Sequence, residues 1–247
     1  MSQRPAPVFV NYPRPNPGAP LRLFCLPYAG GGPTIYWPWA KALPALEVCP
    51  VGLPGRGTLL NLPPHTSVGP LVAELARAMQ AHLDKPFALF GHSMGALVAF
   101  ELARELRRSY GRLPAALIVG GRNAPHWPRE NRPDLHGLPD AELVAELKVL
   151  GGTPPEVLAH AELMELILPV MRADLAIHET YEYVAEAPLA CPVVALGGTR
   201  DDRTTQAGLE AWGELTTGRF ALEWFEGGHF FVHETGLVTT AVQRHLL

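Results

Sequence analysis

One serine of the chain stands in a setting that can make it a nucleophile. Ser93 is the centre of Gly91-His-Ser-Met-Gly95, a match to the pattern G-x-S-x-G. An apolar run over residues 87–90 comes before the motif, and a helix is expected after it, over residues 96–108. In a strained turn between a strand and a helix, flanking glycines avoid a collision with neighbouring backbone, and the serine Oγ is lifted out of the sheet. The motif therefore predicts that Ser93 attacks an acyl carbonyl.

A serine hydroxyl needs a base to take its proton, and in this type of site the base is a histidine late in the chain. The chain has ten histidines, so position must select among them. His229 follows the last expected strand in the glycine-containing loop Glu226-Gly-Gly-His-Phe-Phe231, and it is the predicted base. His233 lies four residues later, but no Glu follows His229 as the zinc-protease motif would require.

A carboxylate should orient the histidine from the end of the preceding strand. The segment Ala195-Leu-Gly-Gly-Thr-Arg-Asp-Asp202 supplies two candidates, Asp201 and Asp202. Either carboxylate, buried beside the imidazole, could hold the tautomer and stabilise the imidazolium. The residues by themselves leave both candidates open.

The oxyanion of the attacked carbonyl needs backbone N–H donors. One is expected from Met94, directly after the nucleophile, and the other from Ala29 in the loop Tyr28-Ala-Gly-Gly-Gly-Pro33. Small residues in that loop let the backbone approach a substrate. A nucleotide-binding loop is excluded because the spacing is not G-x-G-x-x-G and Pro33 interrupts it.

The elements that must position these residues alternate along the chain. Short apolar runs predict strands over residues 21–26, 47–52, 87–90, 115–119, 192–196 and 220–225. Helices are predicted over residues 37–46, 68–83, 96–108, 206–215 and 235–247. The alternation predicts an α/β protein with a mostly parallel central sheet and helices on both faces. With the serine motif and the late histidine, this is the α/β-hydrolase fold.

The domain organisation follows from where this alternation starts and stops. Residues 1–20 contain six prolines and are predicted to form an irregular arm, whereas residues 21–247 form one domain. From about 125 to 188 no strand is predicted, and helix-like runs cover residues 141–150, 155–160 and 163–183. We interpret this stretch as a helical insertion between two strands of the sheet.

Charge, apolar runs and cysteine content indicate which partners and which cellular compartment to expect. The net charge of −4 argues against nucleic acid as a partner. No apolar run approaches the ~18 residues of a membrane helix, and the start of the chain does not resemble a signal peptide. Cys25, Cys49 and Cys191 are too few and too scattered for a disulfide framework. We expect a cytoplasmic monomer with free thiols.

Six segments in a fixed order resemble a known family. They are Leu26-Pro-Tyr-Ala-Gly-Gly31, Leu53-Pro-Gly-Arg56, Phe90-Gly-His-Ser-Met-Gly95, Leu150-Gly-Gly-Thr-Pro154, Ala195-Leu-Gly-Gly198 and Gly227-Gly-His-Phe-Phe231. From about Leu21 onward the chain resembles the type II thioesterases that accompany polyketide synthases and nonribosomal peptide synthetases. The resemblance implies hydrolysis of acyl thioesters from the phosphopantetheine arm of carrier proteins, which frees stalled or misprimed synthases. Such a reaction needs no metal or organic cofactor, since the phosphopantetheine belongs to the carrier.

The resemblance also bears on single residues. The family's aspartate follows the Gly-Gly pair by three residues, which selects Asp201. The chain departs from the family at Tyr28, where a histidine is usual, and at Asp202, where a proline usually follows the aspartate. The resemblance further implies that Leu135–Tyr183 is a helical lid over an acyl chamber.

Within this lid an apolar stripe is expected to pack against the core and in part to line an acyl pocket. Its members are Leu163, Leu166, Ile167, Val170, Met171, Leu175 and Ile177. Pro169 predicts a kink or a break in the same helix. Arg56 and Arg122, each beside glycines, are expected to brace loops near the site.

Several alternatives stay open. The cluster Arg104, Arg107, Arg108 and Arg112 either offsets the dipole of a helix C-terminus or meets an acidic carrier protein. The enzyme could release a finished product rather than remove aberrant acyl groups, or it could be a carboxylesterase for small esters. A binding module without catalysis is disfavoured, because a binder needs no serine, histidine and acid.

Overall fold

The computed structural model describes residues 7–129 and 133–247, and within them six parallel strands form one sheet. The strand order is β2-β1-β3-β4-β5-β6. The strands are β1 Arg22–Leu26, β2 Glu47–Pro50, β3 Phe87–His92, β4 Leu117–Gly120, β5 Val193–Gly198 and β6 Phe220–Phe225. Each lies where the sequence predicts a strand, with small shifts at the ends. The predicted α/β architecture with a parallel sheet is confirmed.

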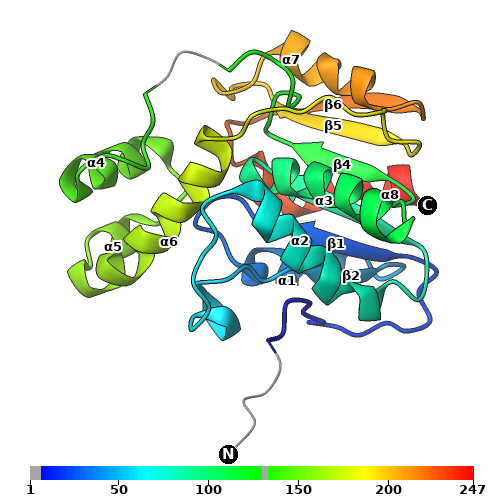
Figure 1. Cartoon of the computed structure of the whole chain (residues 1–247), viewed down its shortest axis with the longest axis horizontal. Helices are drawn as coiled ribbons and strands as arrows, with labels where there is room; N and C mark the ends of the chain where they lie inside the picture. Colours follow the sequence, from blue (N-terminus) through cyan, green and yellow to red (C-terminus); the bar gives the residue numbers. More distant parts are fainter. Residues whose placement is uncertain (1–6, 130–132) are drawn as a thin grey trace, which may run out of the picture.

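Helices cover both faces of this sheet (Figure 1). The α-helices around the sheet are α1 Trp37–Ala42, α2 Val68–Met79, α3 Met94–Tyr110, α7 Gln206–Glu210 and α8 Thr235–Leu246. Short 3-10 helices are η1 Pro33–Tyr36, η2 Gly57–Leu59, η3 Gln80–His82, η4 Ala211–Leu215 and η5 Phe231–His233. One apolar core lies between the sheet and α2, α3 and α7, and a second lies between the sheet and α1 and α8.

Strands β1 to β5 are largely apolar because both of their faces are buried, whereas the edge strand β6 is only partly buried. In β1, Phe24 and Leu26 belong to the core under α2 and α3, whereas Leu23 and Cys25 belong to the core under α1 and α8. Side chains of a strand alternate between the two faces, so a strand between two helical layers needs apolar residues at every position. Because all six strands are parallel, their carboxyl ends lie at one edge of the sheet.

The segment before β1 runs along the sheet edge formed by β2. Residues 7–20 contain no helix or strand, and residues 1–6 lie outside the described part of the chain. Phe9 and Val10 are buried in the core, and Val10 forms an isolated antiparallel bridge with Val51. Asn11 N–H donates to the Pro50 carbonyl at 3.0 Å. The segment therefore covers part of an edge strand that would otherwise leave its backbone groups unpaired.

Three helices lie between β4 and β5 in the chain, and Figure 1 shows them grouped to one side of the sheet. They are α4 Asp140–Leu150, α5 Pro155–Leu158 and α6 Ala161–Glu179, and we call them the helical insertion. The predicted insertion, about 125–188, covers them, although its residues 130–132 lie outside the described part. The insertion has an apolar cluster of its own: Leu143, Leu147, Leu158, Met164, Leu168, Met171 and Leu175.

Helix α6 differs from its prediction in three ways. It runs through Pro169 as one helix, so of the predicted kink or break the break is wrong and the kink stays a prediction. It ends at Glu179 rather than at residue 183, and the Thr180 hydroxyl donates to the Ala176 carbonyl at 2.8 Å. Leu163 and Leu166 are 40% and 61% exposed, because the insertion packs through the neighbouring face of the helix.

Two predictions from composition can be compared with the described residues. None of the helices there is both long enough and apolar enough to cross a membrane. The three cysteines are free, as predicted, and all three are buried. Burial raises the pKa of Cys191 to about 11 and that of Cys49 to about 12, which keeps both as thiols at neutral pH.

Candidate active site

Ser93 occupies the turn between β3 and α3. Its φ of 56° makes it the only non-glycine residue of the described chain with a positive φ. A Cβ on Gly91 would lie 2.0 Å from the Gly95 carbonyl oxygen, and a Cβ on Gly95 would lie 2.3 Å from the Leu26 carbonyl oxygen. Real atoms cannot approach so closely, so glycine is required at both positions. Strained backbone of this kind is common at catalytic residues.

The structure brings Ser93, His229 and Asp201 into one hydrogen-bonded chain. His229 Nε2 lies 3.0 Å from Ser93 Oγ, and His229 Nδ1 lies 2.9 Å from Asp201 Oδ2. Because a carboxylate only accepts, Nδ1–H donates to Asp201 and Nε2 is left to accept the serine O–H. The three residues follow β3, β6 and β5, so they meet at the carboxyl edge of the sheet.

The carboxylate bonded to His229 is that of Asp201, and Asp202 is exposed. Asp201 is 7% exposed, and its second oxygen accepts the Arg203 N–H at 3.0 Å. Burial by itself would raise the pKa of Asp201. The hydrogen bond and charge of His229, with the Arg203 N–H, outweigh burial and hold this pKa below its ordinary value. Asp201 is therefore ionised at neutral pH.

The two expected oxyanion donors lie on neighbouring segments. Gly95 packs against the Leu26 and Pro27 carbonyls, so the first turn of α3 lies against the chain leading to Ala29. Within the described part of the chain, no hydrogen bond uses the N–H of Ala29 or of Met94. Both donors are thus available to a substrate oxygen, and the N-terminus of the long helix α3 adds positive potential.

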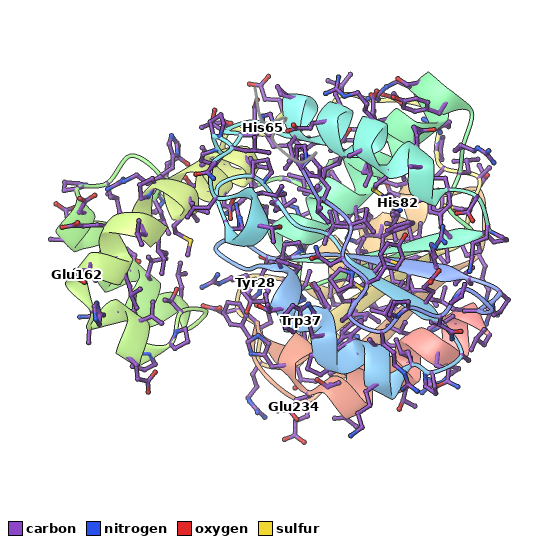
Figure 2. The ribbon with its side chains drawn as sticks, turned by 90° about the horizontal axis from the view of Figure 1, so that it is seen from below. Tyr28, Trp37, His65, His82, Glu162 and Glu234 are labelled. Atoms are coloured by element: carbon purple, nitrogen blue, oxygen red, sulfur yellow. The ribbon has the colours of Figure 1, made fainter. Side chains whose placement is uncertain are left out.

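Sequence reasoning missed the aromatic groups that surround His229. The Tyr28 hydroxyl is 2.9 Å from His233 Nε2, and the Phe230 ring packs edge-on against both Tyr28 and His229 with centroids 5.1 Å apart. Tyr28 lies on the side of the core that faces the helical insertion (Figure 2). The sequence signal for this contact was the tyrosine at position 28, where the family usually has histidine, because a tyrosine there can form a hydrogen bond with His233. Across residues 7–129 and 133–247, no three His, Cys, Asp or Glu side chains gather to hold a metal ion.

A cavity of about 330 Å³ opens beside Ser93 and His229, and residues of the insertion form part of its lining. Leu175 of the predicted stripe lines it, together with the apolar residues Trp127, Leu135 and Leu150. The lining also includes Arg122, which the sequence placed near the site, and the polar or charged residues Arg129, His178 and Glu179, which it did not suggest. The cavity can hold an acyl group next to the serine hydroxyl.

The arginine cluster on α3 has acidic partners within the chain. Glu186 binds Arg104 at 2.8 Å and Arg107 at 2.9 Å, and it also pairs with Arg108. Arg107 further donates to the Ala187 carbonyl at 2.8 Å. These contacts tie α3 to the segment that follows α6, so Arg104, Arg107 and Arg108 have a role within the fold. Contact of the cluster with a carrier protein stays a prediction.

His178 is expected to make the protein less stable in mild acid. Burial, followed by the charges of Arg122 and Arg129, lowers its pKa to about 3. Below about pH 6.5 His178 becomes protonated in the unfolded chain but stays neutral in the folded protein. The free energy of unfolding therefore decreases as the pH falls. When the pH falls from 7 to 5, the free energy of unfolding, measured in urea, should decrease by about 1–2 kcal/mol less in His178→Asn than in the wild type. His160→Asn, at an exposed position, is the control, and equal losses in all three proteins would contradict this account.

Comparison with known proteins identifies the family. The thioesterase domain family matches residues 21–246. The chain is 44% identical over 225 residues to linear gramicidin dehydrogenase LgrE of Brevibacillus parabrevis, covering 90% of this chain and 85% of LgrE. It is 37% identical over 222 residues to thioesterase PikA5 of Streptomyces venezuelae, covering 89% of this chain and 78% of PikA5.

A solved structure gives the same result. The type II thioesterase BorB from the borrelidin biosynthetic cluster has a TM-score of 0.88 and 40% identity, covering 97% of this chain and 98% of BorB. LgrE is named a dehydrogenase, but the matching family is that of thioesterase domains, and both PikA5 and BorB are named thioesterases. The predicted α/β-hydrolase fold, the resemblance to type II thioesterases and the predicted thioester hydrolysis are confirmed. The chain therefore belongs to the thioesterase family.

Proposed function

We propose that this enzyme hydrolyses acyl groups from the phosphopantetheine thiol of carrier proteins, with Ser93, His229 and Asp201 as its catalytic triad. The observation that carries the proposal is the hydrogen-bonded chain from Ser93 Oγ through His229 to Asp201 beside a cavity of about 330 Å³. A hydroxyl, a base and a buried carboxylate in this order perform acyl transfer.

The reaction proceeds in two steps. His229 Nε2 takes the Ser93 proton while Oγ attacks the thioester carbonyl, and the N–H groups of Ala29 and Met94 bind the oxyanion. The carbon–sulfur bond then breaks, the leaving pantetheine sulfur takes the proton from His229, and the acyl group stays on Ser93. His229 then deprotonates a water molecule, which attacks the acyl-enzyme. The bond to Ser93 Oγ breaks, His229 returns the proton to Oγ, and the free acid is released. Asp201 stabilises the imidazolium in both steps.

Carrier proteins are the partners that the relatives suggest. YbtT, 34% identical with a TM-score of 0.86, is a type II thioesterase from the yersiniabactin NRPS/PKS pathway, and BorB is one from the borrelidin cluster. We propose the same class of partner for this chain, with removal of stalled acyl groups as its role. We further propose that it acts as a cytoplasmic monomer and that these steps need no metal or organic cofactor.

Release of a finished product is the second candidate role. The chain is 35% identical to a segment of AmbE and 36% identical to a segment of MbtB, and it spans only 10% and 15% of those synthetases. A thioesterase segment within a synthetase favours release, whereas the similarity to the separate proteins PikA5 and BorB favours editing.

The test compares acyl groups and carriers. Short acyl groups on a phosphopantetheinylated carrier protein should be hydrolysed with kcat/KM at least about tenfold above that for matched oxygen esters. Ser93→Ala is the control for background hydrolysis. Faster hydrolysis of the oxygen esters would overturn the proposal in favour of a carboxylesterase. A preference for full-length chains over short acyl groups would favour product release.

A further inference from the structure

A buried ion pair connects helix α6 to the loop that follows β2. The guanidinium of Arg56 binds both carboxylate oxygens of Asp174, with Nη1–Oδ2 and Nη2–Oδ1 distances of 2.6 Å. The two side chains are 12% and 1% exposed. A two-pronged pair of this kind fixes direction as well as distance. Arg56 thus braces a loop, as predicted, and its partner lies 118 residues further along the chain.

The same pair holds the backbone directly after Ala29. Asp174 Oδ2 accepts the Gly30 N–H at 2.7 Å, and Arg56 Nη1 donates to the Gly31 carbonyl at 3.0 Å. Both carboxylate oxygens of Asp174 therefore accept hydrogen bonds. One of the donors, the Gly30 N–H, belongs to the turn that contains Ala29. The ion pair and the turn form one hydrogen-bonded unit.

The turn itself explains why this contact matters. Residues 28–31 are closed by a hydrogen bond from the Gly31 N–H to the Tyr28 carbonyl at 2.9 Å. Gly30, the third residue, has a φ of 75°, as a type II turn requires. The closing bond leaves the N–H groups of Ala29 and Gly30 unused, and Asp174 takes the second of them.

Helix α6 lies directly on this turn. A Cβ on Gly30 would be 2.2 Å from Met171 Cε, and a Cβ on Gly55 would be 3.2 Å from Val170 Cγ2. Val170 and Met171 are four and three residues before Asp174, so all three lie on one face of the helix. The helix therefore contacts the turn with apolar atoms and holds it with a carboxylate.

We propose that Asp174 is a positioning residue that aims the Ala29 N–H at the oxyanion, so that the helical insertion forms part of the catalytic apparatus. The two peptide groups on either side of Ala29 share its Cα. Asp174 holds the Gly30 N–H of the peptide after Ala29. The Tyr28 carbonyl, in the same peptide as the Ala29 N–H, accepts the Gly31 N–H. The peptide carrying the Ala29 N–H therefore cannot rotate freely. This inference rests on the proposed role of Ala29. Asp174 acts through the turn and does not touch the substrate.

The test is Asp174→Asn, which keeps the shape of the side chain but removes its charge and one of its two acceptor oxygens. For butyryl-N-acetylcysteamine, kcat per active site should fall about tenfold to hundredfold while KM stays within about twofold. Active sites are counted by complete labelling of Ser93 with a fluorophosphonate. A trifluoromethyl ketone inhibitor, whose tetrahedral adduct carries an oxyanion, should weaken by a similar factor.

A merely structural role would lower the number of active sites and leave kcat per site and inhibitor affinity unchanged, which would overturn the inference. Arg56→Lys offers a milder change, since the ammonium keeps the charge but lacks the planar fork that binds both carboxylate oxygens, and it should also lower kcat. Arg172→Gln is the matched control on α6: Arg172 binds Asp140 and the His136 carbonyl, away from the turn. It should leave kcat unchanged.

The same measurements separate this inference from the proposed function. If the wild type does not hydrolyse carrier-bound thioesters but still hydrolyses butyryl-N-acetylcysteamine, the proposed substrate is wrong and Asp174 can still be tested. If carrier thioesters are hydrolysed and Asp174→Asn retains full kcat per site, the positioning role alone is wrong.

Discussion

Replacing Ser93 with alanine is expected to lower kcat for thioester hydrolysis by about 10⁴–10⁶-fold. The substitution removes the oxygen that lies 3.0 Å from His229 Nε2, so no acyl-enzyme can form at this position. His229→Ala should cost a similar factor, because the hydroxyl then keeps its proton. The double variant should lose little more than either single one, since the residues act as a unit. Release of the thiol, followed with a thiol-reactive dye, gives the rate.

This experiment needs a folding control and has one outcome that would contradict the mechanism. Thermal unfolding should show that the variants remain folded, since Ser93→Ala deletes one oxygen and keeps the Cβ and the backbone conformation of residue 93. Activity of Ser93→Ala close to that of the wild type, in protein that a fluorophosphonate no longer labels, would rule out the proposed mechanism.

Asp201→Asn is expected to lower kcat by about 10⁴-fold. The carboxylate now accepts the Nδ1–H of His229 at 2.9 Å, whereas an amide can present N–H to the ring and favour the other tautomer. In that tautomer Nε2 carries the proton and cannot accept one from Ser93. The loss should appear in kcat for thiol release at neutral pH and diminish in strongly alkaline solution, where hydroxide replaces the base.

Asp202→Asn is the matched control, because it makes the same chemical change at the next residue, which is exposed. Its kcat should stay within about threefold of the wild type. The reverse pattern, a large loss for Asp202→Asn with little change for Asp201→Asn, would assign the acid to Asp202 and would conflict with the geometry around His229.

The sequence by itself determined the elements whose signals are local. The turn at Ser93 needs glycines two residues away on either side, and the strands are apolar because the sheet is covered on both faces. Both requirements leave a pattern within a few residues. The late histidine could be chosen in the same way, since His229 follows the last strand in a loop with glycines. The resemblance of the six segments then added the class of substrate.

The tertiary structure decided what depends on residues far apart in the chain. The chemistry of the two aspartates is identical, so the resemblance alone selected Asp201 from the sequence, and only the fold shows it buried beside His229, 28 residues away. The buried face of α6 was predicted incorrectly at Leu163 and Leu166, because apolar residues surround much of that helix and its periodicity does not say which face meets a partner. The contacts of Asp174 with Arg56 and Gly30 span 118 and 144 residues. Contacts of that length follow from how the helical insertion packs on the sheet edge, which no local pattern records.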